Sequence, residues 1–411
     1  MINKIKQYDW KKYNYSLLVA VIILCLLSAF TVKLAGGEES GMSYMKGQLM
    51  GMFLGIIIVA FLSMFDYHFI CKFVGVYYVV GILLTAATRS PIGTDNRTSA
   101  WRWIRLGPIT FQPSELLKVI LILTLAVVFV KLSNRLNRWS TLAIIFALTI
   151  VPVMLILSQP DLSSSLVVLF IMVIMVVVAG VSYRLLFPII ALGLPIGAVL
   201  FWYIQQPYNI LLKANILKDY HYRRIMAWLY PDKWDPTGDL NYQQNRSIRA
   251  IASGQLSGKY LQDGGTQAGQ SRAYHAVGVN ESDFIWSVIG EEFGFLGCCM
   301  ILLLFAFVIF KCFMVAKKSQ DYLGKLIAAG VASMYMFQVF TNICVVTLLL
   351  PNTGLPLPFI SNGLSSMISS MIGIGLIMNI GIQPAKSSKG FSMRNMYGNG
   401  PSSEIDLDLE L

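Results

Sequence analysis

Long apolar windows alternate with short polar connections along most of the chain. A helix of about 20 apolar residues crosses the roughly 30 Å hydrocarbon core of a membrane. Windows near this length lie at residues 15–34, 47–64, 70–87, 116–130, 141–157, 165–181, 185–204, 284–309, 326–350 and 365–382. The pattern predicts an all-α polytopic membrane protein with about ten transmembrane helices.

The polar stretches predict how the chain is divided. Residues 1–14 form a short N-terminal segment, residues 15–383 hold the apolar windows, and residues 384–411 are rich in Ser, Gly and Asn before an acidic end, which predicts a disordered tail. An even number of spans puts both termini on one side of the membrane. If that side is the cytoplasm, most of the basic residues in short loops lie inside, as the positive-inside rule requires.

Composition supports a membrane protein and excludes the usual soluble classes. The chain has 411 residues, of which 56% are hydrophobic and 13% charged, and its mean hydropathy is +0.64. The six cysteines lie in or beside apolar windows without the paired spacing of a disulfide framework or a zinc site. The three histidines, His68, His221 and His275, are scattered, so we expect no metal site built on histidine or cysteine.

Residues 88–112 break the charge pattern on the predicted exoplasmic side. This loop carries one acid, Asp95, and four arginines, which are Arg89, Arg97, Arg102 and Arg105. A guanidinium group suits phosphate, and Trp101 and Trp103 flank Arg102 as interfacial aromatic residues. Two interpretations remain open for these arginines, a specific phosphate ligand and ordinary anionic lipid headgroups.

Residues 206–283 form a second, much longer exoplasmic loop, between the seventh and eighth windows. Loops beyond about 12–15 residues are usually functional or disordered. This one begins with an aromatic and basic cluster, His221, Tyr222, Arg223, Arg224 and Trp228. Residues 241–252, which include Arg246 and Arg249, have helical spacing. We expect an interfacial helix there that brings its charges close to Asp283.

Three acids follow one another where this loop enters the next window. Asp283 stands at the junction, and Glu291 and Glu292 follow roughly 12 Å deeper at about 1.5 Å per residue. Ionised groups inside a membrane span are costly and mark functional candidates. Asp283 has two possible roles, general base and helix N-cap. Glu291 and Glu292 could pair with a neighbouring helix or face a cavity.

Other polar residues favour structural roles. Glu115 and Lys118 are three residues apart at the start of a window and can form an ion pair on one helix face. Asp161 lies between two windows, where Pro160 and the following serines are expected to start the next helix. The glycines of residues 253–258 and 373–381 do not follow a strand, which favours turns and close helix packing over a nucleotide-binding loop.

Five stretches carry a more specific signal. They are AWRWIRLGPITFQPSELLKV (100–119), SQPDLSSSLV (158–167), YQQNRSIRAIASGQLSGK (242–259), ESDFIWSVIGEEFGFLG (281–297) and NTGLPLPFISNGLSS (352–366). In this order, across most of the chain, they resemble the SEDS family (shape, elongation, division and sporulation), whose members include RodA, FtsW and SpoVE.

The resemblance implies a ten-helix enzyme of the bacterial plasma membrane. Such an inverting peptidoglycan glycosyltransferase polymerises lipid II, the undecaprenyl-pyrophosphate-linked disaccharide peptide, on the exoplasmic face and acts with a class B penicillin-binding protein. The family's essential aspartate corresponds to Asp283 and its essential tryptophan to Trp103, while the Glu and Lys of its QPSE motif correspond to Glu115 and Lys118. The resemblance implies no nucleic-acid partner.

This reaction needs a base for the attacking sugar hydroxyl and cations for the leaving pyrophosphate. Asp283 is the candidate base. The candidate substrate-binding residues are Trp103, Arg102, Arg105, Arg223, Arg246 and Ser361, with Arg224 as a further option. A divalent ion such as Mg²⁺ could share this work, although no ligand cluster in the sequence indicates one.

Some positions depart from the family pattern, and they bear on the cellular role. The usual Pro-Glu-x-His-Thr before the aspartate is replaced at residues 278–282, and Leu364 follows Gly363 where a glycine pair is usual. Residues 65–67 are closer to RodA, which favours cell-wall elongation and cell shape over division or sporulation. A lipid II flippase and a scaffold are the competing functions; a flippase would have its charges near the midplane rather than on one side.

Overall fold

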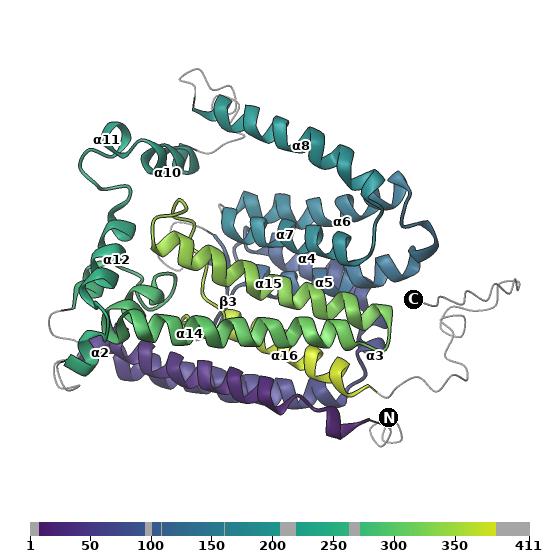
Figure 1. The fold of residues 1–411 in the computed structure, drawn as a ribbon, viewed down its shortest axis with the longest axis horizontal. Helices are drawn as coiled ribbons and strands as arrows, with labels where there is room; N and C mark the ends of the chain where they lie inside the picture. The colour runs from purple at the N-terminus through teal and green to yellow at the C-terminus, as the bar shows by residue number, and fades with distance from the viewer. Residues whose placement is uncertain are drawn as a thin grey trace, which may run out of the picture.

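The structure is a computed structural model that describes residues 8–94, 101–107, 109–159, 161–205, 219–262 and 272–383. Arg97, Pro160 and the predicted tail lie outside these ranges. The apolar helices are α2 (Tyr15–Met64), α4 (Val74–Ala87), α5 (Pro113–Lys131), α6 (Trp139–Ser158), α7 (Leu162–Val178), α8 (Tyr183–Ile204), α14 (Ile285–Lys318), α15 (Tyr322–Val346) and α16 (Leu364–Ile382). Seven of them are long and apolar enough to cross a membrane, and α4 and α7 are shorter. This confirms the predicted all-α polytopic membrane protein (Figure 1).

Helix α2 contains the first two predicted windows as the arms of a hairpin. The chain turns at Gly37, whose φ of 60° and ψ of −154° lie in a region open essentially to glycine. Gln48 Nε2 donates to Ser28 Oγ across the arms at 2.6 Å. The hydroxyls of Tyr13 and Ser63 lie 3.5 Å apart at the far ends. With α2 counted as two arms, the described helices match the ten predicted windows.

Several predicted boundaries were wrong; for example, α14 continues to Lys318, well beyond the predicted end near residue 309. The third window begins within a separate short helix, α3 (Tyr67–Lys72), and the spanning helix α4 starts only at Val74. Helix α15 ends at Val346, not near residue 350, because Leu348 has a positive φ of 60° and Cys344 O accepts hydrogen bonds from the amides of Leu349 and Leu350. Hydropathy does not detect such ends, because the residues beyond them are apolar too.

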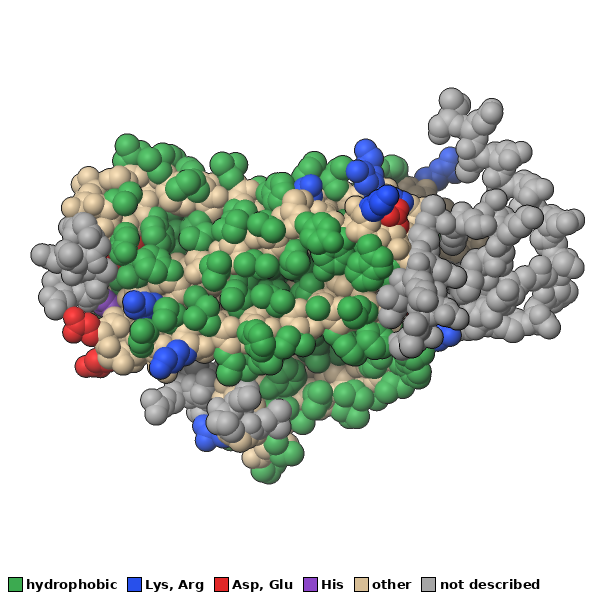
Figure 2. Space-filling view, turned by 90° about the horizontal axis from the view of Figure 1, so that it is seen from below, with side chains coloured by type: hydrophobic (Ala, Val, Ile, Leu, Met, Phe, Trp, Pro, Cys, Tyr) green, Lys and Arg blue, Asp and Glu red, His purple; other side chains and the backbone are tan. Residues whose placement is uncertain are grey.

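The helices differ in how deeply they are buried. Helices α5, α15 and α16 form the centre of the bundle, and most of their residues are buried. Helix α8 stands apart from the other spans, and none of its apolar window is buried (Figure 1). The six cysteines are all free, and five of them are buried. On the face drawn in Figure 2, apolar side chains cover most of the surface and few charged ones interrupt them, as contact with lipid requires.

A small sheet interrupts the predicted loop at residues 88–112. Strands β1 (Gly93–Thr94), β2 (Trp103–Leu106) and β3 (Ile109–Phe111) are antiparallel, in the order β1-β2-β3. Thr94 pairs with Trp103, and Arg105 pairs with Thr110. The sheet leads directly into α5, which begins with Pro113. The sequence pattern predicted a loop here and did not anticipate these strands.

The long loop is also structured. It contains α10 (Asp219–Leu229), α11 (Pro231–Trp234), α12 (Tyr242–Ser253), α13 (Lys259–Gln262) and a 3-10 helix, η3 (Ala273–Ala276). The predicted helix at residues 241–252 is confirmed by α12. Its residue Gln244 donates to Val345 O at 2.6 Å and Leu350 O at 2.8 Å, which anchors α12 over the end of α15.

Candidate active site

Asp283 lies just before α14, in a turn that the neighbouring chain holds by its backbone. Asn342 Nδ2 on α15 donates to Asp283 O at 2.8 Å and to Leu355 O at 2.7 Å. The Ser361 hydroxyl donates to Ser282 O at 2.6 Å and accepts from Leu357 N at 2.7 Å. The loop between α15 and α16 thus frames the turn, and Ser361 is a direct part of that frame.

The Asp283 carboxylate does not cap the helix. The N-cap of α14 is Phe284, which makes no side-chain capping hydrogen bond. Within the described ranges, no hydrogen-bond donor contacts the Asp283 carboxylate, so the alternative role as N-cap is wrong. The side chain is half-buried and available to a ligand.

Four charged side chains act on this carboxylate. Burial is the largest influence and raises the pKa of Asp283 to about 6. Arg102 and Arg224 lower the pKa, whereas Asp161 and Glu281 raise it. Burial outweighs the two cations, so the group titrates close to neutral pH.

The two arginines are both fixed to loop carbonyls. Arg102 Nε donates to Gln159 O at 3.0 Å, and its Nη1 lies 4.0 Å from Asp161 Oδ2. Arg224 Nη1 on α10 donates to Asn352 O at 2.9 Å. Asp283 therefore feels charges from the segment just before β2, from α10 and from the start of α7, which are far apart in the sequence.

Asp161 has the structural role that the sequence favoured. It is the N-cap of α7, and it accepts from Ser164 N at 3.0 Å and from the Ser164 hydroxyl at 2.9 Å. Its charge also acts on Asp283, which the sequence pattern did not indicate.

The remaining predicted cations make other contacts. Arg105 is exposed on β2, two residues after the half-buried Trp103. Arg223 pairs with Asp219 at 2.7 Å on an exposed face of α10. Arg246 lies over the Tyr242 ring, 4.4 Å from its centroid. The cations whose charge acts on Asp283 are Arg102 and Arg224.

Gly354 is a part of the site that sequence reasoning missed. Its φ is +68°, and a Cβ at this position would lie 3.0 Å from Asp283 Oδ2. The glycine therefore keeps the space in front of the carboxylate open. Its place in the stretch NTGLP, within the motifs, was the available signal.

Glu115 and Lys118 form the expected contact inside α5. Lys118 Nζ lies 2.7 Å from Glu115 Oε1, and both side chains are almost fully buried. Ser369 on α16 donates to Glu115 O at 2.7 Å, so the pair lies where α5 meets α16.

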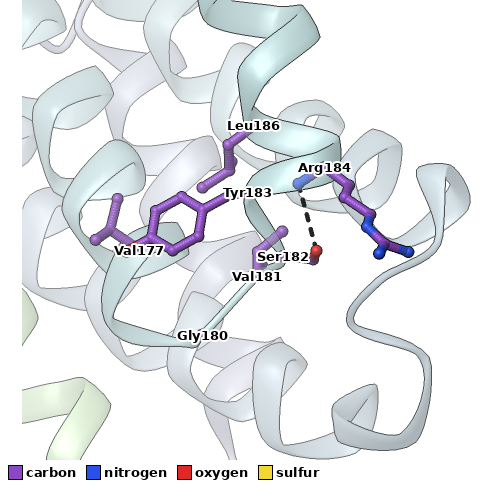
Figure 3. Close-up of a pocket in the computed structure, with 7 residues that line it drawn as sticks. All are labelled: Val177, Gly180, Val181, Ser182, Tyr183, Arg184 and Leu186. Atoms are coloured by element: carbon purple, nitrogen blue, oxygen red, sulfur yellow. Dashed lines mark hydrogen bonds between the residues drawn. The ribbon is translucent and has the colours of Figure 1, made fainter.

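A cavity of about 470 Å³ lies elsewhere, at the turn between α7 and α8 (Figure 3). Residues between Val177 and Leu186 line it, and Arg184 is its one charged residue. This turn is at the opposite end of the bundle from the start of α14 (Figure 1), which Asp283 directly precedes, so the cavity is separate from the candidate site. In the described part of the chain, no group of three His, Cys, Asp or Glu side chains is arranged to hold a metal ion.

The family model for FtsW, RodA and SpoVE, described as "Cell cycle protein", matches residues 11–386. The chain belongs to this family. Among FtsW/RodA/SpoVE relatives, "Probable peptidoglycan glycosyltransferase FtsW" of Geobacter sulfurreducens is 31% identical over 385 residues, which cover 92% of this chain and 96% of that protein. "Peptidoglycan glycosyltransferase MrdB" of Escherichia coli is 29% identical over 381 residues, with 92% and 96% covered.

Solved FtsW/RodA/SpoVE-like structures share the fold. A chain from "Structural coordination of polymerization and crosslinking by a peptidoglycan synthase complex" matches with a TM-score of 0.72 and 28% identity, covering 90% of this chain and 97% of that one. The rod shape determining protein RodA of Thermus thermophilus matches with a TM-score of 0.62 and 25% identity, covering 92% and 98%.

Proposed function

We propose that this protein is a peptidoglycan glycosyltransferase that polymerises lipid II, with Asp283 as its general base. The observation that carries the proposal is a half-buried carboxylate with a pKa near neutral, acted on by two anchored arginines. A general base works best when its pKa is close to the operating pH. Relatives similar over nearly their whole length are named peptidoglycan glycosyltransferases.

The reaction assigns a task to each group. Asp283 takes the proton from the attacking sugar hydroxyl, whose oxygen forms a bond to the anomeric carbon of the donor. The bond from that carbon to the pyrophosphate breaks, and the electron pair leaves with the lipid pyrophosphate. Arg102 and Arg224 stabilise the developing charge, since guanidinium groups bind phosphate oxygens well. Trp103, Arg105, Arg223 and Arg246 are candidates for binding more distant parts of the substrate.

We place the Asp283 end of the bundle on the exoplasmic side of the plasma membrane. The opposite end holds the start of α2 and the end of α16, which Asp9 N and Ile382 O join at 3.0 Å. That end also carries the basic residues Lys131, Arg135 and Arg138, which the positive-inside rule assigns to the cytoplasm. Both termini are then cytoplasmic.

The substrate also needs an apolar path for its polyprenyl tail. Helix α8 is the candidate span whose apolar window has no buried residue, and the chain continues from it to α10 and Arg224. We therefore place the tail in lipid beside α8, with the pyrophosphate reaching the arginines from the membrane.

The proposed partner is a class B penicillin-binding protein that crosslinks the new strands. The similar chain in a complex described for polymerisation and crosslinking supports this assignment. We assign the pair to cell-wall elongation and cell shape, on the RodA-like residues 65–67. Depletion in the source organism tests this role: rods should become round, whereas filaments would indicate division.

The decisive experiment compares wild type with Asp283→Asn in lipid II polymerisation, each purified with the same class B partner. We expect the variant to lose at least about 100-fold in rate, because general base catalysis contributes typically 10²–10⁴-fold. Glu39→Gln is the matched control, since it removes an exposed carboxylate near the α2 turn. Equal polymer from wild type and a folded Asp283→Asn variant would contradict the assignment of the base.

A further inference from the structure

Glu291 and Glu292 are adjacent in α14, and both side chains are completely buried, at 0% exposure. A buried carboxylate is stable only with charged or hydrogen-bonding partners. The partners described for them come from the long loop, and not from a neighbouring span. Of the two expected roles, the pair with a neighbouring helix is found for Glu291, whose partner Lys259 belongs to the short loop helix α13.

Glu291 binds the backbone at the start of η3. Its Oε1 accepts from Ala273 N at 3.0 Å and its Oε2 from Tyr274 N at 2.9 Å. Lys259 from α13 also contacts Glu291 Oε1 through its ammonium group. One carboxylate thus joins two separate parts of the loop to α14.

Glu292 binds side chains of the same segment. Its Oε1 accepts from Arg272 Nε at 3.0 Å and from the Tyr274 hydroxyl at 2.8 Å. The Tyr274 hydroxyl also lies 3.3 Å from Leu34 O, close to the turn of the α2 hairpin. The two glutamates together hold residues 272–274 on both their main-chain and side-chain sides.

The long loop also supplies hydrogen-bond acceptors at a break in α14, two residues after Glu292. Gly294 has a φ of 64° and a ψ of −167°, which interrupts the helix. The amides beyond the break donate to loop carbonyls, Phe295 N to Gln255 O at 2.8 Å and Leu296 N to Leu256 O at 3.1 Å. A Cβ at Gly294 would lie 2.3 Å from Gly258 N, so loop and helix are in direct backbone contact.

These contacts affect Asp283 because the chain runs from η3 directly to Asp283. From η3 the chain passes through Asn280, whose side chain donates to Tyr274 O at 3.2 Å and Ala35 O at 3.3 Å, and reaches Asp283 three residues later. It then enters α14. Residues 272–292 therefore form a ring that the two glutamates close, with Asp283 in the middle of it.

We propose that Glu291 and Glu292 are positioning residues for Asp283, which fix η3 onto α14 and so hold the turn that carries the base. This inference rests on the proposed function. Removing either carboxylate loosens the ring and admits water beside Asp283. Because burial is what keeps the Asp283 pKa near 6, a loosened ring changes the pH at which the enzyme loses activity, and not only its stability.

The test measures kcat, KM and the pH profile of Glu292→Gln and Glu291→Gln in the full chain with its class B partner. We expect kcat to fall at least tenfold, KM to change less than threefold, and the acid limb to move about one pH unit lower. Hydrogen exchange of residues 272–283 should become faster. Lys259→Met should have a smaller effect, because it leaves both backbone bonds to Glu291 intact, and Glu39→Gln should have none.

Each alternative outcome has a defined meaning. The proposal is overturned if Glu292→Gln has the same hydrogen exchange at residues 272–283 and the same acid limb of the pH profile as wild type. Faster exchange with unchanged kcat and acid limb also overturns it, because the glutamates would then hold the loop without placing the base. If Glu292→Gln does not fold, Arg272→Lys is the second variant, because it keeps a positive charge beside Glu292. It should move the acid limb to lower pH by less than the shift expected for Glu292→Gln. An active Asp283→Asn variant would defeat the proposed mechanism, while the exchange data would still test the ring.

Discussion

At the scale of single residues, the environment of Asp283 predicts the pH dependence of the enzyme. The carboxylate must be ionised to take a proton, so activity should fall as pH decreases through about 6, rather than through the ordinary aspartate value of about 4. Asp161→Asn should move this acid limb lower, because it removes a negative charge that raises the Asp283 pKa. Asn caps helices as well as Asp does, so the variant should fold. The measurement is kcat against pH, and an acid limb that moves higher would contradict the assignment.

The sequence pointed to the proposed base but only to part of its surroundings. Asp283, Trp103 and Arg102 lie in the local motifs that carry the SEDS resemblance, and such motifs can be read along the chain. Arg224 and Gly354 reach the site through loops that fold back over the bundle, so their closeness to Asp283 depends on contacts between distant segments. Asp161 was recognised as structural because its hydrogen-bond partner Ser164 is close to it in the sequence. Its effect on the Asp283 pKa depends on closeness in space, which the sequence does not show.

At the scale of the elements, two long helices are interrupted at glycines that have similar φ and ψ angles but different surroundings. A residue with a side chain at Gly37 or Gly294 is strained by about 1–3 kcal/mol. At Gly37 a Cβ would meet only His275, at 3.4 Å, whereas at Gly294 it would collide with the Gly258 backbone. We therefore expect Gly294→Ala to lower the thermal unfolding temperature more than Gly37→Ala does. Equal decreases in the unfolding temperature would contradict this prediction and would show that backbone strain alone determines the loss of stability.

Apolar windows predicted the helices well because a transmembrane helix needs apolar side chains over a fixed length, whether they face lipid or other helices. The breaks were not predictable in the same way. Gly294 lies within an apolar run, and only its contact with the loop makes the break stable. The sheet at residues 93–111 was missed because its strands are short and pair with each other, and not with a long apolar face.

At the scale of the whole molecule, a polar cluster joins the helices at the end opposite to Asp283. His68 Nδ1 lies 2.7 Å from Asp66 Oδ1, and its Nε2 lies 2.9 Å from Asp321 Oδ2, at the start of α15. Tyr67 N donates to Asn379 Oδ1 on α16 at 3.1 Å. Burial lowers the pKa of His68, but the hydrogen bonds to Asp321 and Asp66 outweigh it and raise the value to about 9.

This cluster predicts how stability depends on pH. A histidine whose folded pKa is raised stabilises the protein fully below its unfolded value of about 6.5, and this stabilisation is lost as pH rises through about 9. Between these values the thermal unfolding temperature of wild type should fall. His68→Gln should be less stable at pH 6 and should show little of that fall. A wild-type protein with the same unfolding temperature at pH 6 and pH 9.5 would contradict the prediction.

The break at Gly294 also has a consequence for how the protein is made. An amide without a partner inside a membrane costs several kcal/mol. The carbonyls of Gln255 and Leu256, which serve Phe295 and Leu296, precede them in the chain and leave the ribosome first. When this span enters the bilayer, its acceptors have therefore already been synthesised and are tethered close by, so that the interrupted helix can be completed as it is inserted.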